Sequence, residues 1–359
     1  MSNIRQIQNH KGRGALSNIA GRFEDFVSEF CDDGWDVLER EQSKPKTHLH
    51  LDMARKVLSH NSSPDVPFDQ SINPYRGCEH GCVYCFARPT HAYLGHSAGL
   101  DFETEIYHKP QAAELLQSEL SKPSYTPKVI ALGTNTDPYQ PIEKTHTITR
   151  QILEVLAACK HPFSITTKSS LILRDLDIIA PMAKAGLAAV AVSVTSLDHK
   201  LSAKLEPRAT APHKRIKTLR ALSQAGINPS VLIAPIIPAI NDWELEHIMT
   251  TSSRAGATNA NYILLRQPHE VKALMDEWLE IHMPDKRKRV QSLMRQSRGG
   301  KYNQSAWGTR MTGTGPYAET LRQRFHLARN RLGLKSRMVN LDCSQFKPPK
   351  KPSAQFDLF

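Results

Sequence analysis

Phe163-Ser-Ile-Thr-Thr and Ala188-Ala-Val-Ala-Val-Ser-Val are two short apolar runs that decide the fold of this chain. Runs of this kind, rich in β-branched and small apolar residues, are typical of strands that are buried on both faces. Between them, residues 171–185 have the spacing of an amphipathic helix. A strand, a helix and a second strand in this order predict a βαβ unit with two parallel strands and a right-handed crossover.

The same alternation continues on both sides of this unit. Further strands are expected at residues 68–73, 129–133, 230–237 and 262–265, and further helices at 142–158, 213–225 and 243–255. About six strand–helix units are too few for a closed eight-stranded barrel. We therefore expect an α/β fold, a partial (β/α)6 TIM-like barrel, with its functional groups at the carboxyl ends of the strands.

The 359 residues divide unevenly by pattern and charge. We expect an N-terminal extension over residues 1–45, the partial barrel over 46–270, a helical and basic C-terminal region over 271–346 and a disordered tail over 347–359. Residues 285–359 contain 17 basic and 4 acidic residues, a net charge of +13, whereas the whole chain has +12. The positive charge is therefore local, which favours an anionic partner for the last quarter of the chain.

No apolar run reaches the roughly 18 residues that a membrane-spanning helix requires. The first residues, Met1-Ser-Asn-Ile-Arg-Gln, lack the apolar core of a secretory signal. We therefore expect a cytoplasmic protein that does not bind membranes. Six cysteines in so long a chain do not indicate a disulfide scaffold.

Three of the cysteines lie in one segment, Pro74-Tyr-Arg-Gly-Cys78-Glu-His-Gly-Cys82-Val-Tyr-Cys85-Phe, directly after a predicted strand. One loop could bring these three thiolates to one inorganic centre. A structural zinc site takes four protein ligands, often as two Cys-x-x-Cys pairs, and there is no second pair here. An iron–sulfur cube held by three thiolates leaves one iron with an open position. A zinc loop and purely structural thiols are the alternatives.

This loop resembles that of the radical S-adenosylmethionine (SAM) superfamily. Its flanks, residues 71–91 and 134–143, are similar to the bacterial branch related to spore photoproduct lyase, often called DNA repair photolyase-like proteins. The resemblance covers roughly residues 46–346. It implies a lyase-like enzyme whose [4Fe-4S] cluster, on Cys78, Cys82 and Cys85, receives an electron from a flavodoxin- or ferredoxin-like donor and cleaves SAM reductively. A 5′-deoxyadenosyl radical then abstracts hydrogen from a substrate.

The resemblance also implies SAM contacts at the strand ends. Lys168 is similar to a lysine that contacts SAM in spore photoproduct lyase, and Tyr84 occupies the superfamily's usual aromatic position beside the adenine. The usual Gly-Gly-Glu after the second strand is absent, so the polar segment 134–137 is expected to meet the SAM amino group instead. The full set of expected contacts is Tyr84, Thr134, Thr136, Asp137, Lys168, Ser193, Thr195 and Glu206. Alternatively, Asp137 is a turn former, and Lys168 and Glu206 are solvated.

Spore photoproduct lyase takes its hydrogen donor, a cysteine, from the segment after its second strand, and residues 133–137 here contain none. Cys31 and Cys343, in the terminal segments, are candidate donors if those segments fold over the barrel mouth, and inert thiols otherwise. Cys159 is expected at the bottom of the barrel, away from SAM.

The C-terminal region contains a Gly-rich, basic and aromatic stretch that includes Arg298, Lys301, Trp307 and Arg310. Such residues can approach a phosphate backbone and stack on an extruded base, which favours DNA or RNA as the partner. The N-terminal Arg13-Gly-Ala-Leu-Ser-Asn is similar and is expected to join it. A solvated basic face is the alternative, and the substrate is then a protein or a small metabolite. A further interpretation, outside the enzymes, is a non-catalytic nucleic-acid-binding protein with a structural metal loop.

Overall fold

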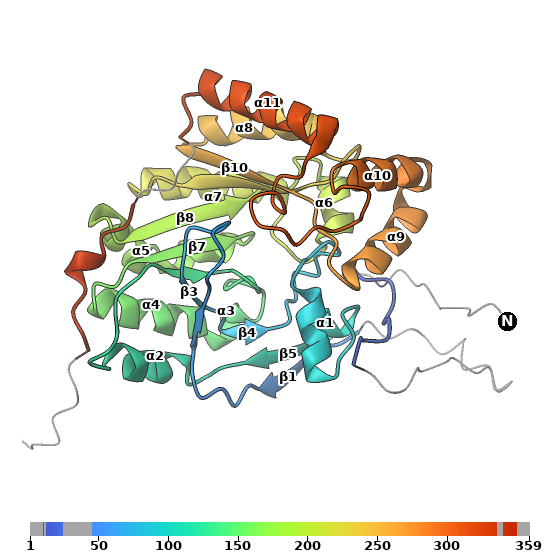
Figure 1. Cartoon of the computed structure of the whole chain (residues 1–359). Helices are drawn as coiled ribbons and strands as arrows, with labels where there is room; N and C mark the ends of the chain where they lie inside the picture. Colours follow the sequence, from blue (N-terminus) through green and yellow to red (C-terminus); the bar gives the residue numbers. More distant parts are fainter. Residues whose placement is uncertain (1–9, 11, 24–44, 336–339, 350–359) are drawn as a thin grey trace, which may run out of the picture.

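The computed structural model describes residues 10, 12–23, 45–335 and 340–349. Its main sheet has seven strands in the order β10-β9-β8-β7-β6-β3-β2 (Figure 1). The strands are β2 (Leu58–His60), β3 (Gln70–Ile72), β6 (Ile130–Leu132), β7 (Phe163–Thr167), β8 (Ala188–Ser193), β9 (Ser230–Ile236) and β10 (Asn259–Leu264). All neighbours from β3 to β10 pair in parallel, and β2 pairs antiparallel at the edge.

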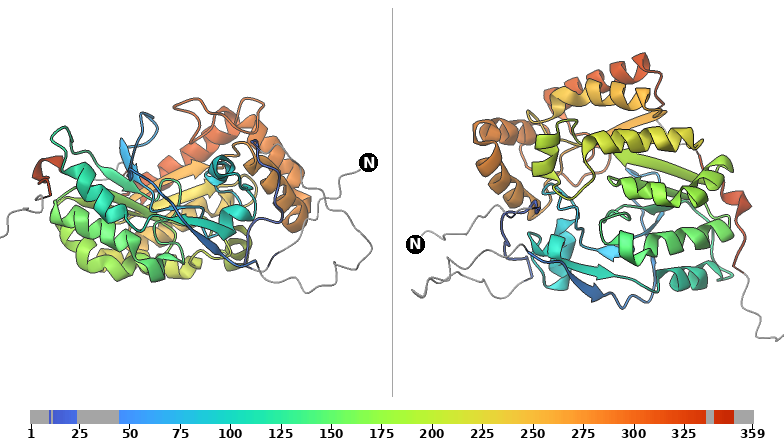
Figure 2. Two further views of the ribbon diagram at one scale, coloured as in Figure 1. Left: turned by 90° about the horizontal axis from the view of Figure 1, so that it is seen from below. Right: turned by 180° about the vertical axis from the view of Figure 1, so that it is seen from behind.

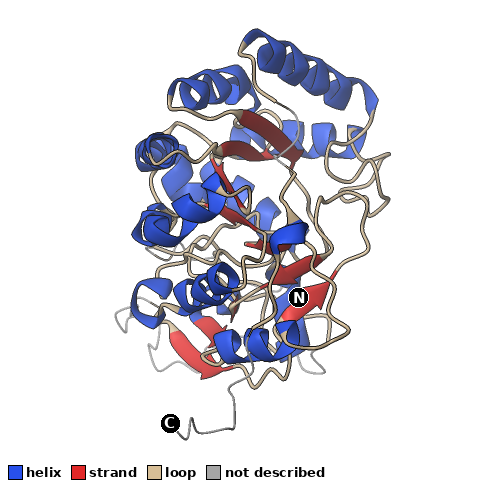
Figure 3. Cartoon of the chain, turned by 90° about the vertical axis from the view of Figure 1, so that its left-hand side faces the viewer, coloured by secondary structure: helices blue, strands red, loops and turns tan. Residues whose placement is uncertain are grey.

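Helices return the chain from the end of one strand to the beginning of the next. They are α4 (Ile148–Ala158), α5 (Leu176–Lys184), α6 (His199–Leu205), α7 (Pro212–Gln224) and α8 (Leu245–Arg254). Each new strand is added at the same edge of the sheet, so right-handed crossovers place the helices on one face. Figure 2 shows this helical layer from behind, and Figure 3 shows the other face covered mainly by loops.

The expected α/β architecture with a parallel sheet is confirmed. The described strands form an open sheet, because no pairing joins β10 to β2 or β3. The predicted helix at 142–158 is divided into α3 (Glu143–His146) and α4 by Thr147, whose φ of 52° interrupts helical geometry. The predicted helix at 171–185 begins as a 3-10 turn, η3 (Ser170–Asp175), before α5.

A second, smaller sheet did not follow from the sequence. It has the order β1-β5-β4, with β1 (His48–Leu51), β5 (Glu105–His108) and β4 (Tyr75–Arg76). These strands have only two to four residues, which is too short for an apolar alternation to be recognised in the sequence. The sheet nevertheless matters for the site, because β4 ends directly before the three-cysteine loop.

The remaining helices lie around this framework. They are η2 (Arg88–Leu94), α1 (Asp101–Thr104), α2 (Ala112–Leu120), η4 (Asp242–Glu244), α9 (Val271–His282), α10 (Pro284–Gln296), α11 (Gly315–Arg331) and η5 (Cys343–Gln345). The predicted C-terminal helices are thus present as α9, α10 and α11. Within the described part of the chain, no helix is long and apolar enough to cross a membrane.

Candidate functional site

One pocket lies where the parallel strands end, the edge at which such folds carry their functional groups. Residues of the three-cysteine loop line it together with residues at the ends of β6, β7, β8, β9 and β10. Its lining includes Cys78, His80, Cys82, Tyr84, Cys85, Phe86, Thr134, Asn135, Thr136, Asp137, Thr166, Thr167, Lys168, Ser193, Ala234, Pro235, Leu264 and Arg266.

Tight turns carry the three thiols to this pocket. The N–H of Gly81 donates to the carbonyl of Cys78 at 3.3 Å, and the N–H of Cys85 donates to that of Cys82 at 3.2 Å. Gly81 has a φ of +65°, and a Cβ there would lie 2.7 Å from the Glu103 carboxylate. Glycine at position 81 therefore permits both the turn and its close packing.

The thiols occupy an environment that suits a positively charged centre. Cys78 and Cys82 are buried, and Cys85 is partly exposed. Burial raises the pKa of Cys78 well above its usual value and that of Cys82 to about 12, although Lys168 opposes the shift of Cys82. These thiolates need a compensating cation, which a bound metal centre supplies as it displaces their protons.

The resemblance assigns the three thiols to a cluster rather than to a single ion. Among the described residues, no group of three His, Cys, Asp or Glu side chains is arranged to hold one metal ion. A cubane cluster does not require such convergence, because each thiolate binds a different iron.

Lys168 directly follows β7 and lies beside the cysteine loop. Its Nζ is 5.7 Å from the centroid of the Tyr84 ring. Burial acts to lower the pKa of Lys168, but Cys82 and Glu206 act in the other direction and the net shift is upward. The net shift favours the charged form of Lys168 in the pocket wall.

Asp137 connects the ends of two neighbouring strands. Its carboxylate accepts hydrogen bonds from Thr167 Oγ1 and from the N–H of Lys168, both at 2.7 Å, and lies 3.4 Å from His80 Nδ1. Burial acts to raise the pKa of Asp137, but His80 and these donors lower it to about 2. Asp137 lines the pocket as an ionised group whose oxygens hold the surrounding loops in place.

Thr134 and Thr136, in the same loop, also line the pocket. Thr134 Oγ1 donates to the side-chain oxygen of Asn73 at 3.1 Å, and Thr136 Oγ1 donates to the carbonyl of Tyr75 at 3.2 Å. Both hydroxyls thus fix this loop against residues just before the cysteine loop.

Ser193 ends β8 and Thr195 follows it, and both hydroxyls donate to the carbonyl of Ala234, at 3.2 and 2.9 Å. Ser193 lines the pocket, whereas Thr195 and Glu206 are buried outside its lining. The Tyr84 hydroxyl donates to Glu206, and Thr195 Oγ1 lies 3.2 Å from the same carboxylate. Glu206 therefore holds the Tyr84 hydroxyl from outside the pocket lining.

Sequence reasoning missed Arg215, the partner of Glu206. The Arg215 Nη2 to Glu206 Oε1 distance is 2.5 Å, and neither side chain is exposed. Arg215 lies on the buried stripe of α7 with Thr218, Leu219 and Leu222. The sequence did contain a signal for this residue, because Arg215 stands at a position that the helical spacing assigns to the buried stripe.

Cys343 lies at the end of the sheet where the parallel strands begin, opposite to the pocket. Its neighbour Asp342 donates its N–H to the carbonyl of Gly186, just before β8, and the backbone of Val129, just before β6, bonds the Cys343 thiol. The expectation that Cys343 reaches the site from over the mouth is therefore wrong, because its segment packs at the beginnings of the strands.

Cys159 also lies at that opposite edge, as its position after a helix predicts. The N–H of Lys347 donates to the Cys159 carbonyl at 2.8 Å. Cys31, the other candidate donor, lies outside the described residues.

Arg13 does not belong to a nucleic-acid surface, because it is buried beside the cysteine loop. Its guanidinium donates to the carbonyls of Glu103 and Pro45, both at 2.7 Å. The N–H groups of Gly14 and Ala15 bind the Glu103 carboxylate at 3.0 and 2.8 Å. This N-terminal segment therefore covers the back of the three-cysteine loop.

Arg298 and Arg310 are likewise held internally, which corrects their expected contact with a phosphate backbone. Arg298 is 1% exposed. Its guanidinium donates to the carbonyls of Leu264, Leu265, Thr309 and Arg310. Arg310 Nε lies 2.5 Å from Asp65 Oδ2. Lys301 is exposed.

Comparisons with known proteins identify the family. A family model described as "Radical SAM superfamily" matches residues 72–251. An uncharacterized protein of Mycobacterium tuberculosis is 37% identical over 232 residues, 64% of this chain and 68% of the relative. One of Methanocaldococcus jannaschii is 29% identical over 191 residues, 53% of this chain and 68% of the relative.

Solved structures resemble the fold. A cysteine-to-serine mutant of spore photoproduct lyase has a TM-score of 0.58 and 17% identity, with 80% of each chain covered. Spore photoproduct lyase complexed with dinucleoside spore photoproduct has a TM-score of 0.55 and 15% identity, with the same coverage. The match to the family model, which spans half of the chain, shows that this chain belongs to the radical SAM superfamily and is an enzyme.

Proposed function

We propose that this enzyme holds a [4Fe-4S] cluster on Cys78, Cys82 and Cys85 and acts on a nucleic-acid base or lesion. The observation that carries the cofactor part is that all three thiols of one loop line the same pocket as Lys168. When bound, the cluster and SAM supply reductive cleavage of the sulfonium and hydrogen abstraction from substrate. A flavodoxin- or ferredoxin-like protein is the proposed electron donor.

The chain's own residues would bind and orient SAM. Lys168, a half-buried cation, would pair with the methionine carboxylate. Tyr84, held by Glu206, would cover the adenine, and the Ser193 hydroxyl would face the ribose. The loop of residues 134–137 would face the amino group.

Anoxic reconstitution tests this cofactor set. We expect about four irons and four sulfides per chain, the brown absorption of a cluster, and 5′-deoxyadenosine after reduction with SAM. Cys82→Ser should lose the cluster, and Cys159→Ser, at the opposite edge, should keep it. One zinc per chain, or a full cluster in Cys82→Ser, would contradict the proposal.

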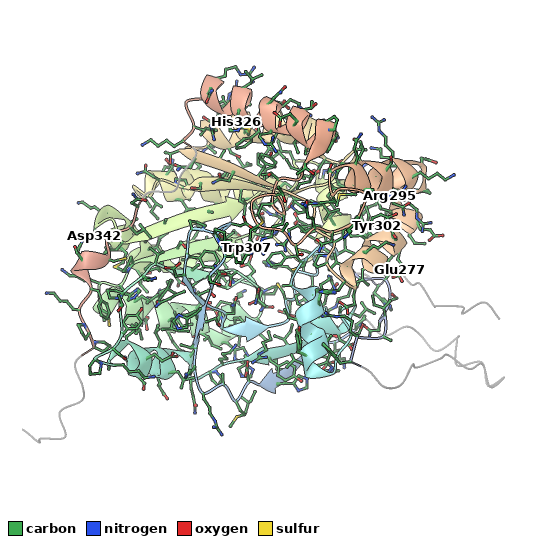
Figure 4. The ribbon with its side chains drawn as sticks, in the orientation of Figure 1. Glu277, Arg295, Tyr302, Trp307, His326 and Asp342 are labelled. Carbon is green, nitrogen blue, oxygen red and sulfur yellow. The ribbon has the colours of Figure 1, made fainter. Side chains whose placement is uncertain are left out.

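A basic and aromatic surface supports nucleic acid as substrate. Helix α10 exposes Lys286, Lys288 and Arg289. In the loop that follows, Tyr302 lies 4.6 Å from Lys272 Nζ and 6.0 Å from the Arg295 guanidinium, measured to its ring centroid. Farther along this loop, Trp307 is 60% exposed. Figure 4 shows Arg295, Tyr302 and Trp307 from this region.

The likeness to spore photoproduct lyase, whose complex with a dinucleoside spore photoproduct is known, also supports DNA repair of a lyase type as the reaction class. The donor must differ, however. Among the described residues, the pocket contains no cysteine beyond the three of the loop. Hydrogen return would therefore come from SAM, from the substrate, from a reductant or from Cys31, which lies outside the described residues.

Binding to an oligonucleotide duplex at increasing salt tests the substrate class. Changing Lys286, Lys288 and Arg289 together to Ala should weaken binding and flatten its salt dependence, because phosphate contacts release counterions. A duplex affinity that is insensitive to salt and to these changes would favour a protein or a small metabolite instead.

A further inference from the structure

Two aromatic side chains flank Cys85, and each has a cation against its ring. On one side is Tyr84 with Lys168, and on the other is Phe86, whose ring centroid lies 5.3 Å from the Arg266 guanidinium. Arg266 follows β10 and lines the same pocket. The Phe86 ring is 46% exposed, whereas Tyr84 is buried. The Arg266 side is therefore the open side of the pocket.

The two cations differ in how their charge is compensated. Lys168 has Cys82 and Glu206 nearby, and its pKa is raised. Burial lowers the pKa of Arg266, and Arg310 lowers it further, while the Asp65 carboxylate opposes this. That carboxylate is already held by Arg310 at 2.5 Å. Arg266 therefore faces the pocket without a counter-ion of its own.

The hydrogen-bond donors of Arg266 are also free. Within the described part of the chain, Arg266 makes no hydrogen bond or ion pair, and its buried Nε has no partner. Its neighbour Arg298, also cationic, uses its donors on backbone carbonyls. A partly buried guanidinium with unmet donors is costly. A ligand with acceptor oxygens and negative charge would remove this cost.

We infer that Arg266 binds an anionic group of the substrate, a backbone phosphate of the nucleic acid, at the mouth of the pocket. This inference rests on the proposed function. A guanidinium binds phosphate oxygens through two parallel hydrogen bonds. The basic Gly-rich loop lies alongside, since the N–H of Leu264 donates to the Met311 carbonyl at 2.8 Å. The SAM carboxylate is the other source of an anion, and the proposed function assigns it to Lys168 on the Tyr84 side.

The test uses the cluster-loaded protein with SAM but without reductant, so that no turnover occurs. Fluorescence anisotropy gives the Kd of a labelled oligonucleotide, and equilibrium dialysis gives the Kd of SAM. Arg266→Gln should weaken oligonucleotide binding at least tenfold and SAM binding less than twofold. Arg266→Lys should recover part of the loss. The matched control is Arg254→Gln, an exposed arginine before β10 at the other edge of the sheet, which should change neither.

The outcomes separate the hypotheses. Weaker SAM binding with unchanged oligonucleotide binding would assign Arg266 to the cofactor and overturn the inference. Unchanged binding of both SAM and the oligonucleotide by Arg266→Gln would also overturn the inference. Wild-type protein that binds an acidic peptide but no oligonucleotide would overturn it as well. The proposed cofactor chemistry fails separately, if reduced wild-type protein forms no 5′-deoxyadenosine. Circular dichroism of each variant verifies that it folds.

Discussion

Glu206 and Arg215 form an ion pair at 2.5 Å in which neither side chain is exposed to solvent. The carboxylate also accepts the Tyr84 hydroxyl, and Arg215 Nη1 donates to the carbonyl of Ser193 at 3.1 Å. One pair of charges therefore holds two elements of the pocket wall, the cysteine loop and the end of β8.

Arg215→Met should lower the free energy of unfolding of the metal-free protein by about 3–5 kcal/mol, because it leaves the Glu206 carboxylate buried and unpaired. Urea unfolding measures this change. The double variant Glu206→Gln/Arg215→Met should lose less free energy of unfolding than Arg215→Met, because the Glu206 carboxylate is then no longer charged. Equal losses in the single and double variants would show that packing, and not charge, sets the effect.

Gly14→Val should separate the N-terminal segment from the cysteine loop. A Cβ at Gly14 would lie 1.8 Å from the Gly81 carbonyl oxygen, so the backbone must move. We expect the cluster absorption to bleach in air several-fold faster, because this segment limits solvent access. Gly12→Asn is the control, since a side chain there meets no atom within 4 Å and Asn tolerates its φ of +82°. Equal bleaching of both variants would contradict a covering role.

Asp65→Asn should loosen the Gly-rich loop. Asp65 pairs with Arg310 and accepts the N–H of Gly308 at 2.6 Å, and both partners belong to that loop. Hydrogen exchange of residues 300–312 should become faster in the variant, because the partly buried ion pair is lost. Asp69→Asn removes an exposed pair with Lys128 and should leave this exchange unchanged. Unaltered exchange in Asp65→Asn would show that other contacts hold the loop.

Stability should fall as pH decreases from about 6.5 to about 4, in part because of His161. Burial lowers the pKa of His161 from 6.5 to about 4, so the unfolded chain binds a proton that the folded protein excludes. In the neutral ring Nδ1–H donates to the Pro162 carbonyl, and Nε2 lies 2.7 Å from the Tyr125 hydroxyl oxygen. His161 alone should account for about 2 kcal/mol of lost stability between pH 7 and pH 5.

Urea unfolding of His161→Gln at both pH values tests this contribution. The variant should lose about 2 kcal/mol less than the wild type over that interval. His326→Gln, on the exposed face of α11, should behave as the wild type does. An unchanged pH dependence in His161→Gln would assign the effect to other groups.

Local patterns predicted much of the fold. The fully buried β8 was recognisable as a continuous apolar run, and β7 matched its predicted bounds. The strands of the second sheet were not recognisable, because elements of two to four residues with polar side chains leave no period to detect. The spacing of Cys78, Cys82 and Cys85 likewise indicated a shared centre.

The sequence by itself determined the parallel sheet and the three-thiol loop, because both are encoded in residues close together along the chain. Only the tertiary structure decided which charges are buried and what they meet: Glu206 with Arg215, Arg13 beneath the cysteine loop, Arg298 on carbonyls, and Arg266 free at the pocket. Composition marked Arg13 and Arg298 as a basic surface. Whether these two arginines are exposed or buried depends on segments distant in sequence that pack over them and remove water. No local sequence pattern shows such packing.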